Sequence, residues 1–203
     1  MKKIGIMGGT FDPIHFGHLV TVEAARDAFG LDEVIFVPSG RPPHKRNIIV
    51  SDAQHRIAMV NHAIISNPHF SLSTMETDRE GYSYTIDTVN EFLRMFGTDT
   101  EIYFITGADA IKEILTWHRV DELMSKCHFI AATRPGFEFN QELHLPESYS
   151  QRIMSIKVPA LAISSSQIRT MVQEGKSIRY LLPDTVEAYI RKNNLYRAGE
   201  SND

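Results

Sequence analysis

The chain has 203 residues, of which 42% are hydrophobic and 23% are charged, and its formal net charge is −4. This composition is typical of a globular protein rather than a disordered or fibrous one, and the length suffices for a buried core in one domain. The acidic balance argues against a general nucleic-acid surface, which usually carries a basic stripe.

Short apolar runs alternate with helical patterns from the N-terminus onward. The sequence predicts a strand at residues 2–8, an amphipathic helix at 17–30 and a second strand at 33–38. That alternation indicates parallel βαβ units. No window approaches about 20 uninterrupted apolar residues, and the N-terminus lacks the apolar run of a signal peptide. We therefore expect a cytoplasmic protein with no membrane partner.

The middle of the chain continues the same alternation. Ser51 opens a capping-box pattern, S-D-A-Q, which predicts the start of a helix that includes residues 55–65. A strand is predicted at 69–75, and the next helix should stop at Gly97. Up to residue 133, the remaining predictions are a helix at 85–97, a strand at 101–107, a helical stretch across 110–126 and a strand at 127–133.

The C-terminal part adds one strand and two helices. Cys127 cannot form an internal disulfide, and its place in an apolar run predicts a core role. A loop from Arg134 to about Gln151 should precede a strand at 154–159 and helices at 164–175 and 183–194, with Pro183 in the first turn of the last helix. We expect one domain over residues 1–203, with a loose tail from about 197.

Residues 8–18, GGTFDPIHFGH, lie between the first strand and the first helix. This arrangement predicts an anion site, because glycine permits close backbone approach and the free N–H groups of a helix start point outward. His15 and His18 could both donate to a phosphate, while Asp12 and Pro13 shape the turn. Alternatives are a plain turn whose histidines cap the helix, or a zinc site, for which H-x-x-H without a third ligand is weak.

The same segment resembles the (T/H)-x-G-H signature of the nucleotidylyltransferase superfamily. Residues 163–169, ISSSQIR, are similar to a second motif of that superfamily, I-S-S-T-x-[IV]-R, with Ser166 in place of threonine. Hydroxyls at a helix start and a planar guanidinium from Arg169 would form a second phosphate clamp. The alternative is a serine N-cap with a solvated Arg169. The resemblance implies an α/β, Rossmann-like parallel sheet flanked by helices, with strand order 3-2-1-4-5.

Within the superfamily, GGTFDPIH and the PPHK of residues 42–45 resemble the nicotinate-nucleotide adenylyltransferases, over about residues 3 to 196. The resemblance implies transfer of AMP from ATP to nicotinate mononucleotide, which yields the dinucleotide precursor of NAD. Mg²⁺ would be carried by the ATP phosphates and keep most of its waters, so no protein metal ligand is expected. Alternatives are another acceptor, such as nicotinamide mononucleotide or phosphopantetheine, or a non-catalytic nucleotide sensor. A class I aminoacyl-tRNA synthetase fragment is disfavoured, because the chain is short and lacks a K-M-S-K-S-like loop.

The resemblance and the motifs together nominate the site residues. The catalytic candidates are His15, His18, Lys45 and Arg169. The ATP-binding candidates are Gly8, Gly9, Thr10, Phe11, Gly17, Gly107, Asp109, Ile163, Ser164, Ser165 and Ser166. The acceptor-binding candidates are Thr85, Trp117 and Arg134.

Some of these residues have structural alternatives. Lys45 could belong to a solvated basic pair with Arg46, and Trp117 could be part of the core. Asp109 could be a helix N-cap, and Arg134 could stabilise its own loop. The sequence leaves the oligomeric state open, a homo-oligomer included.

Overall fold

The computed structural model describes residues 1–40, 50–97, 99–133, 145–159 and 161–197. Six strands form one sheet in the order β3-β2-β1-β4-β5-β6, and every neighbouring pair is parallel. The strands are β1 (Lys2–Gly9), β2 (Glu33–Pro38), β3 (Phe70–Leu72), β4 (Thr100–Gly107), β5 (His128–Thr133) and β6 (Ile153–Lys157). The expected order of five strands is confirmed, and β6 extends the sheet beside β5.

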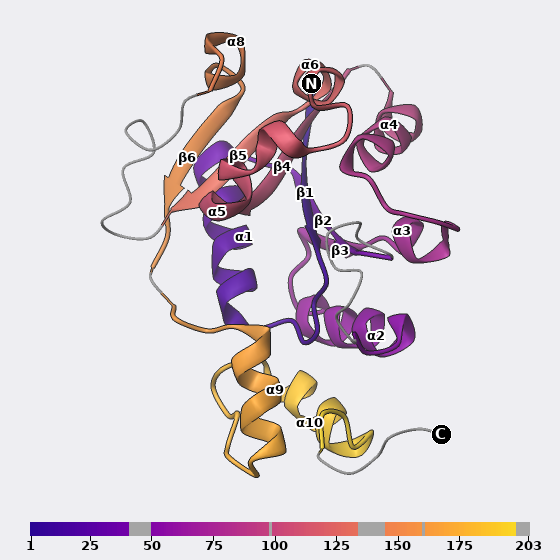
Figure 1. Cartoon of the computed structure of the whole chain (residues 1–203), viewed down its shortest axis with the longest axis vertical. Helices are drawn as coiled ribbons and strands as arrows, with labels where there is room; N and C mark the ends of the chain where they lie inside the picture. The colour runs from indigo at the N-terminus through magenta and orange to yellow at the C-terminus, as the bar shows by residue number, and fades with distance from the viewer. Residues whose placement is uncertain (41–49, 98, 134–144, 160, 198–203) are drawn as a thin grey trace.

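Helices cover both faces of this sheet (Figure 1). One face packs against α1 (Phe16–Phe29), α2 (Ala53–Ile64), α9 (Ser165–Gln173) and α10 (Asp184–Lys192). The other face packs against α4 (Thr85–Phe96), α5 (Ala108–Lys112), the 3₁₀ turn η1 (Ile114–Thr116) and α6 (Val120–Lys126). Two short helices, α3 (Met75–Asp78) and α8 (Glu147–Ser150), flank these layers. The α/β architecture expected from the alternating pattern is therefore confirmed.

The strand sequences explain why both faces are covered. In β1, Ile4 and Ile6 belong to the core beside α4 and α6, whereas Met7 belongs to the core beside α1 and α9. Strand β2 alternates in the same way, with Phe36 in the core beside α1 and α9 and Val37 in the core beside α4 and α6. Because successive side chains of a strand point to opposite faces, a strand that is apolar throughout must be buried on both sides.

The chain path creates a crevice at the carboxyl ends of the strands. From β1 the chain moves outward to β3, then returns to β4 on the other side of β1 and proceeds to β6. The point between β1 and β4, where the direction reverses, is where open α/β sheets bind their ligands. Within the described ranges, no helix is both long enough and apolar enough to cross a membrane.

The start of α2 differs from the prediction. Asp52, not Ser51, is the N-cap, and its carboxylate accepts a hydrogen bond from the backbone N–H of Gln54 at 2.8 Å. The backbone N–H of Ser51 instead donates to the carboxylate of Asp12 at 3.2 Å. Serine and aspartate are both good caps, so the helix begins one residue later than predicted with a cap of equal quality.

Other local predictions need smaller corrections. The helical stretch across 110–126 is broken into α5, η1 and α6, and Arg119 has a left-handed backbone (φ 54°) just before α6. The strand at 69–75 is reduced to β3, because α3 begins at Met75. Pro183 is the N-cap of α10 rather than a residue of its first turn. Cys127 is buried as expected but precedes β5 instead of lying in it.

Candidate active site

Two histidines meet where the turn after β1 enters α1. His15 immediately precedes the helix, His18 lies in its first turn, and the ring centroids are stacked 3.8 Å apart. The backbone N–H of His15 donates to Nδ1 of His18 at 3.3 Å. Because Nδ1 accepts this hydrogen bond, the proton of a neutral His18 ring lies on Nε2. His18 therefore offers an N–H donor to a ligand, and its pairing with His15 also fulfils the helix-capping alternative.

The surroundings keep both imidazoles uncharged. Burial lowers the pKa of His15 to about 4. Burial, helped by the neighbouring His15, lowers the pKa of His18 to about 3. The ring of Phe11, itself 2% exposed, meets His18 edge-on at a centroid distance of 5.2 Å. The ligand-free site thus holds neutral donors, and an arriving phosphate would favour their charged form.

Two glycines of the first motif make room for its own side chains. A Cβ at Gly17 would lie 2.9 Å from the imidazole of His15, and a Cβ at Gly9 would lie 2.9 Å from the ring of Phe11. Both distances are too short for a carbon atom to fit without a shift. These glycines are therefore required by ring packing, in addition to any close approach of the backbone to phosphate.

The second motif is held directly against the first. The hydroxyl of Ser165 donates to the carbonyl oxygen of Pro13 at 2.8 Å, and Nη1 of Arg169 donates to the carbonyl oxygen of Asp12 at 2.7 Å. Ser164 is the N-cap of α9, where its hydroxyl accepts from a backbone N–H at 3.2 Å. The serine-cap alternative is thus correct, but the solvated Arg169 that accompanied it is wrong.

The carboxylate of Asp12 joins these segments. It is 4% exposed, and the hydroxyl of Tyr196 donates to its Oδ1 at 2.7 Å, while the backbone N–H of Ser51 donates to Oδ2. Nη1 of Arg169 lies 4.0 Å from Oδ2. Burial and the adjacent Asp12 raise the pKa of Tyr196 far above its usual range, so the hydroxyl remains a donor. Both carboxylate oxygens are therefore engaged by protein donors.

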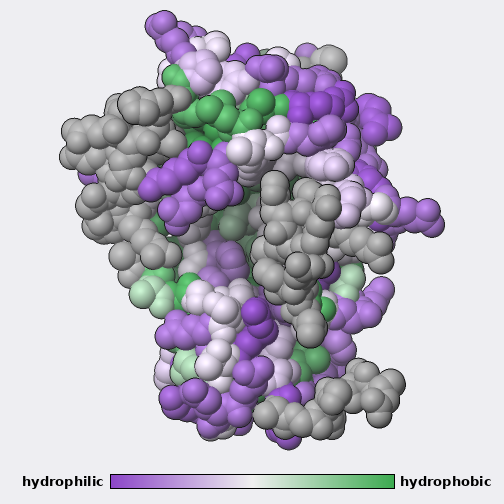
Figure 2. Space-filling model, in the orientation of Figure 1, coloured by the Kyte–Doolittle hydropathy of each residue, from purple (hydrophilic) through white to green (hydrophobic). Residues whose placement is uncertain are grey.

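A cavity of about 360 Å³ opens beside the two motifs. Its walls come from the strand ends, from α1 and from the connection between β6 and α9. The lining residues are Met7, His15, Gly17, His18, Thr21, Gly107, Ala132, Val158, Pro159, Leu161, Ile163, Ser164 and Ser165. Figure 2 shows a hollow in this face of the molecule, between the sheet and the C-terminal helices. Such a size and mixture of apolar walls with a few polar groups are typical of small-ligand sites.

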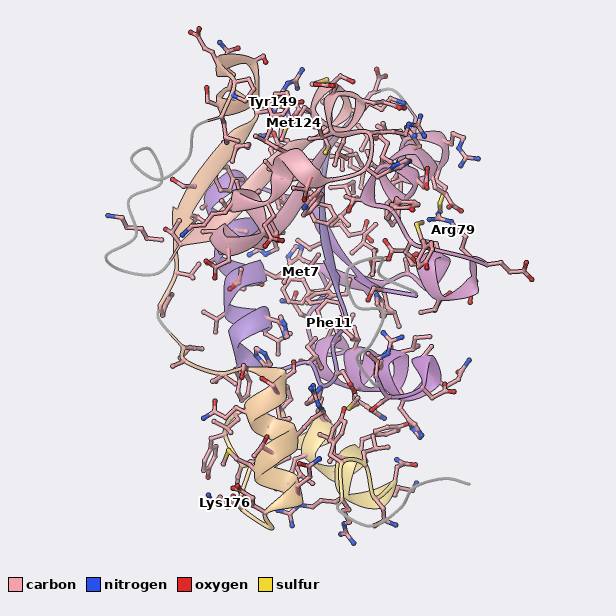
Figure 3. The ribbon with its side chains drawn as sticks, in the orientation of Figure 1. Met7, Phe11, Arg79, Met124, Tyr149 and Lys176 are labelled. Carbon is pink, nitrogen blue, oxygen red and sulfur yellow. The ribbon has the colours of Figure 1, made fainter. Side chains whose placement is uncertain are left out.

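The cavity contains seven of the ATP-binding and catalytic candidates, His15 and His18 among them. Phe11 does not line it, and Figure 3 places Phe11 between the sheet and the C-terminal helices. Asp109 is exposed in the first turn of α5 and is not the N-cap, which is Gly107. Lys45 and Arg134 lie outside the described residues, as do Arg46 and the PPHK segment.

Two of the acceptor-binding candidates, Thr85 and Trp117, lie on the other face of the sheet. Thr85 is the first residue of α4, and Trp117 directly follows η1. Their sequence neighbours touch, since the rings of Tyr84 and His118 are tilted with centroids 4.3 Å apart. The structure therefore brings Thr85 and Trp117 into one region, as a common binding role requires.

Trp117 also has the core role that was its alternative. Its indole meets the rings of Phe104 and Phe129 edge-on, at centroid distances of 5.8 and 6.1 Å. Phe104 lies beneath Gly8, where a Cβ would come within 3.1 Å of its ring. Since the indole remains partly exposed, packing and ligand contact are compatible for this residue.

Two residues of the site, Tyr196 and Arg56, had no predicted role, and Ser51 was predicted only to begin a helix. Tyr196 and Ser51 hold Asp12, and the guanidinium of Arg56 binds three carbonyl oxygens, one in the turn after β1 and two at the ends of the β2–α2 connection. For Arg56 a signal exists, because it precedes Met59 and Val60 by three and four residues and so lies on the apolar stripe of α2. A charged residue on such a stripe indicates buried partners.

The chain is similar to a family of nucleotide-transferring proteins. Residues 6–171 match the family model described as Cytidylyltransferase-like. A protein of Moorella thermoacetica named "Probable nicotinate-nucleotide adenylyltransferase" is 60% identical over 199 residues, which cover 96% of this chain and 92% of that protein. A protein of the same name from a Thermoanaerobacter species is 56% identical over 204 residues, covering 98% and 97%.

Solved structures agree on the fold. The nicotinic acid mononucleotide adenylyltransferase of Plasmodium falciparum, solved in complex with NaAD, superposes with a TM-score of 0.77 at 24% identity. The match covers 97% of this chain and 98% of that one. At this level of identity the likeness supports the arrangement of the sheet and its helices.

The hydrogen bonds of the Asp12 carboxylate with Tyr196 and Ser51, here called the Asp12 junction, predict that Tyr196→Phe destabilises the protein. The change removes the donor to Oδ1 of a buried carboxylate, which typically costs about 1–3 kcal/mol. Urea unfolding would measure it, with Tyr180→Phe as the control, because Tyr180 is 75% exposed. Equal unfolding free energies for Tyr196→Phe and wild type would contradict the junction.

The two histidines predict a pH dependence of stability. Their unfolded pKa is near 6.5, whereas burial lowers the folded values to about 4 and about 3. The unfolded chain therefore binds more protons below pH 6.5, and the free energy of unfolding falls as the pH drops from 6.5 towards 4. Urea unfolding of the ligand-free protein across this range should show a shallower fall for His18→Asn. Parallel curves for variant and wild type would refute the assignment of the lowered pKa.

Proposed function

This chain belongs to the nicotinate-nucleotide adenylyltransferases of the cytidylyltransferase-like family, and on that basis we propose that it transfers AMP from ATP to nicotinate mononucleotide. The products are nicotinate adenine dinucleotide, a precursor of NAD, and pyrophosphate. The observation that best supports this proposal is the direct contact of the two motifs beside one cavity, through Ser165 with Pro13 and Arg169 with Asp12. A nucleotide sensor would have no need of a second clamp placed for a leaving group.

The reaction needs positioning more than acid–base chemistry. A 5′-phosphate oxygen of nicotinate mononucleotide attacks the α-phosphorus of ATP in line, a new P–O bond forms, and the bond to pyrophosphate breaks. Since the nucleophile is already an anion, no general base is required. The protein's contribution is alignment of the two phosphates and stabilisation of the charge that develops between them.

We assign the α-phosphate to His18, because its Nε2–H is the donor left free by the contact with His15. Arg169 holds the carbonyl of Asp12 with one nitrogen, and its other donors are assigned to the leaving pyrophosphate. Ser164, Ser165 and Ser166 stand at the start of α9, where helix N–H groups favour phosphate. Thr10, His15 and Lys45 are proposed to contact the remaining phosphates.

Mg²⁺ fits this site as a companion of the nucleotide. Both oxygens of Asp12 accept hydrogen bonds from Tyr196 and Ser51, and no group of three or more potential metal-binding side chains occurs among the residues that the structure describes. Such surroundings suit a cation carried by phosphate oxygens and water. Bound there, Mg²⁺ would neutralise charge on the triphosphate.

The acceptor is assigned to the region of Thr85 and Trp117. Helix α4 has 12 residues and begins at Thr85, so its free N–H groups suit the pyridine carboxylate. The partly exposed indole of Trp117 can stack on the pyridine ring. Arg134 is proposed for the phosphate of the mononucleotide, by the family resemblance alone.

The proposal is tested most simply by pyrophosphate release from the purified protein. ATP and Mg²⁺ would be supplied with a panel of phosphorylated acceptors, and nicotinate mononucleotide should give the fastest release. ATP binding without release for every acceptor would support the nucleotide sensor instead.

His18→Ala should lower turnover far more than it weakens ATP binding, because a donor aimed at developing charge acts mainly in the transition state. Loss of one such donor typically costs on the order of 10²–10³ in rate. Single-turnover kinetics would measure the loss, and His69→Ala, just before β3, is the control. Near-normal turnover in His18→Ala would show that the α-phosphate is held elsewhere.

Nicotinate mononucleotide should be preferred at least about ten-fold over its amide analogue. A backbone N–H at the start of α4 favours a carboxylate oxygen over a neutral amide, and ten-fold requires only about 1.4 kcal/mol. Specificity constants for both nucleotides and for phosphopantetheine would be compared at fixed ATP and Mg²⁺. Equal use of acid and amide would refute the carboxylate site, whereas preference for phosphopantetheine would refute the acceptor assignment.

A further inference from the structure

Arg56 is a buried cation that binds carbonyl oxygens at three places in two connections of the fold, the turn after β1 and both ends of the β2–α2 connection. It lies in the first turn of α2 and is 3% exposed. Its Nη1 donates to the carbonyl oxygens of Thr10 and Ser39, both at 2.9 Å, and its Nε donates to the carbonyl oxygen of Ser51 at 3.0 Å. Thr10 follows β1, Ser39 follows β2, and Ser51 precedes α2, so one guanidinium fixes the carboxyl ends of two central strands.

These contacts require the shape of arginine. A guanidinium carries five N–H donors in a fixed plane, so it can reach three carbonyl oxygens that come from different directions. Burial lowers the pKa of Arg56, but Asp12 and Asp52 oppose that effect, and an arginine keeps its charge inside proteins. A lysine would place a single ammonium at the same depth and could not span the three acceptors.

The peptide that Arg56 binds leads into a strained turn. Phe11 has a φ of 51°, a left-handed conformation that is uncommon for a bulky residue and persists only where the surroundings hold it. Arg56 holds the carbonyl oxygen just before Phe11, and the ring of Phe11 is held against Gly9. Because the C=O and N–H of a trans peptide point in opposite directions, the N–H of Phe11 is turned away from the guanidinium.

We propose that Arg56 is a positioning residue for the ATP phosphates. By drawing the Thr10 carbonyl inward it removes a negative dipole from the phosphate side of the turn and presents the N–H of Phe11 there. The same contacts with Ser39 and Ser51 fix both ends of the connection between β2 and α2. This role rests on the proposed adenylyl transfer, and it concerns ATP rather than the acceptor, for which Thr85 and Trp117 lie on the opposite face of the sheet.

The test compares Arg56→Lys and Arg56→Met with wild type. ATP binding would be measured by calorimetry without acceptor, and KM would be measured for both substrates. Arg56→Lys should weaken ATP binding at least about ten-fold and leave the KM for nicotinate mononucleotide within about two-fold. Arg56→Met should weaken ATP binding further. If Arg56→Met fails to fold, Arg56→Lys carries the test.

A control variant separates positioning from stability. Ile153→Ala, at the amino end of the edge strand β6, opens a cavity in the core and lowers the melting temperature away from the site. It should bind ATP as wild type does. ATP binding unchanged in Arg56→Lys, or weakened for ATP and acceptor alike, would overturn the proposal. If wild type binds ATP but releases no pyrophosphate, the adenylyl-transfer proposal fails while the comparison of ATP affinities still decides the role of Arg56.

Discussion

The site depends on the hydrogen bonds that the buried carboxylate of Asp12 accepts. A carboxylate inside a protein is costly unless donors surround it. Here the donors come from Tyr196 near the C-terminus and from Ser51 before α2, and Arg169 of α9 lies beside them. Satisfying one charge therefore draws parts of the chain that are far apart in sequence to the end of β1.

These contacts at Asp12 place two helix starts, those of α1 and α9, at the same cavity. The hydrogen bonds of Ser165 and Arg169 set the start of α9 against the turn that leads to the start of α1, so two helix N-termini and two neutral histidines border one cavity. Thr85 and Trp117 occupy the opposite face of the same sheet. The carboxyl end of β1 lies between this region and the cavity, so the phosphates of the two substrates would have to meet there.

Local patterns predicted most of the fold and the motif-bearing part of the site. Apolar alternation predicted the parallel sheet, and the glycine turn predicted that His15 and His18 lie together at a helix start, because these features depend on neighbouring residues. The contacts of Tyr196 and Arg56 depend on tertiary structure, and no local pattern specifies that Tyr196 bonds a residue 184 positions away. The shifted cap at Asp52 and the break before α6 also lie beside long-range contacts, of Ser51 with Asp12 and of Trp117 with Phe104 and Phe129.

We propose that the starts of α1 and α9, which are held together at Asp12 and Pro13, form one nucleotide site. A crystal structure with a non-hydrolysable ATP analogue and Mg²⁺ tests it most directly. We expect the α-phosphate to lie within hydrogen-bond distance of Nε2 of His18, with Arg169 on the terminal phosphates and the adenosine in the cavity lined by Gly107 and Ile163. An analogue that contacts only one of the two helix starts, or that binds at the region of Thr85 and Trp117, would contradict it.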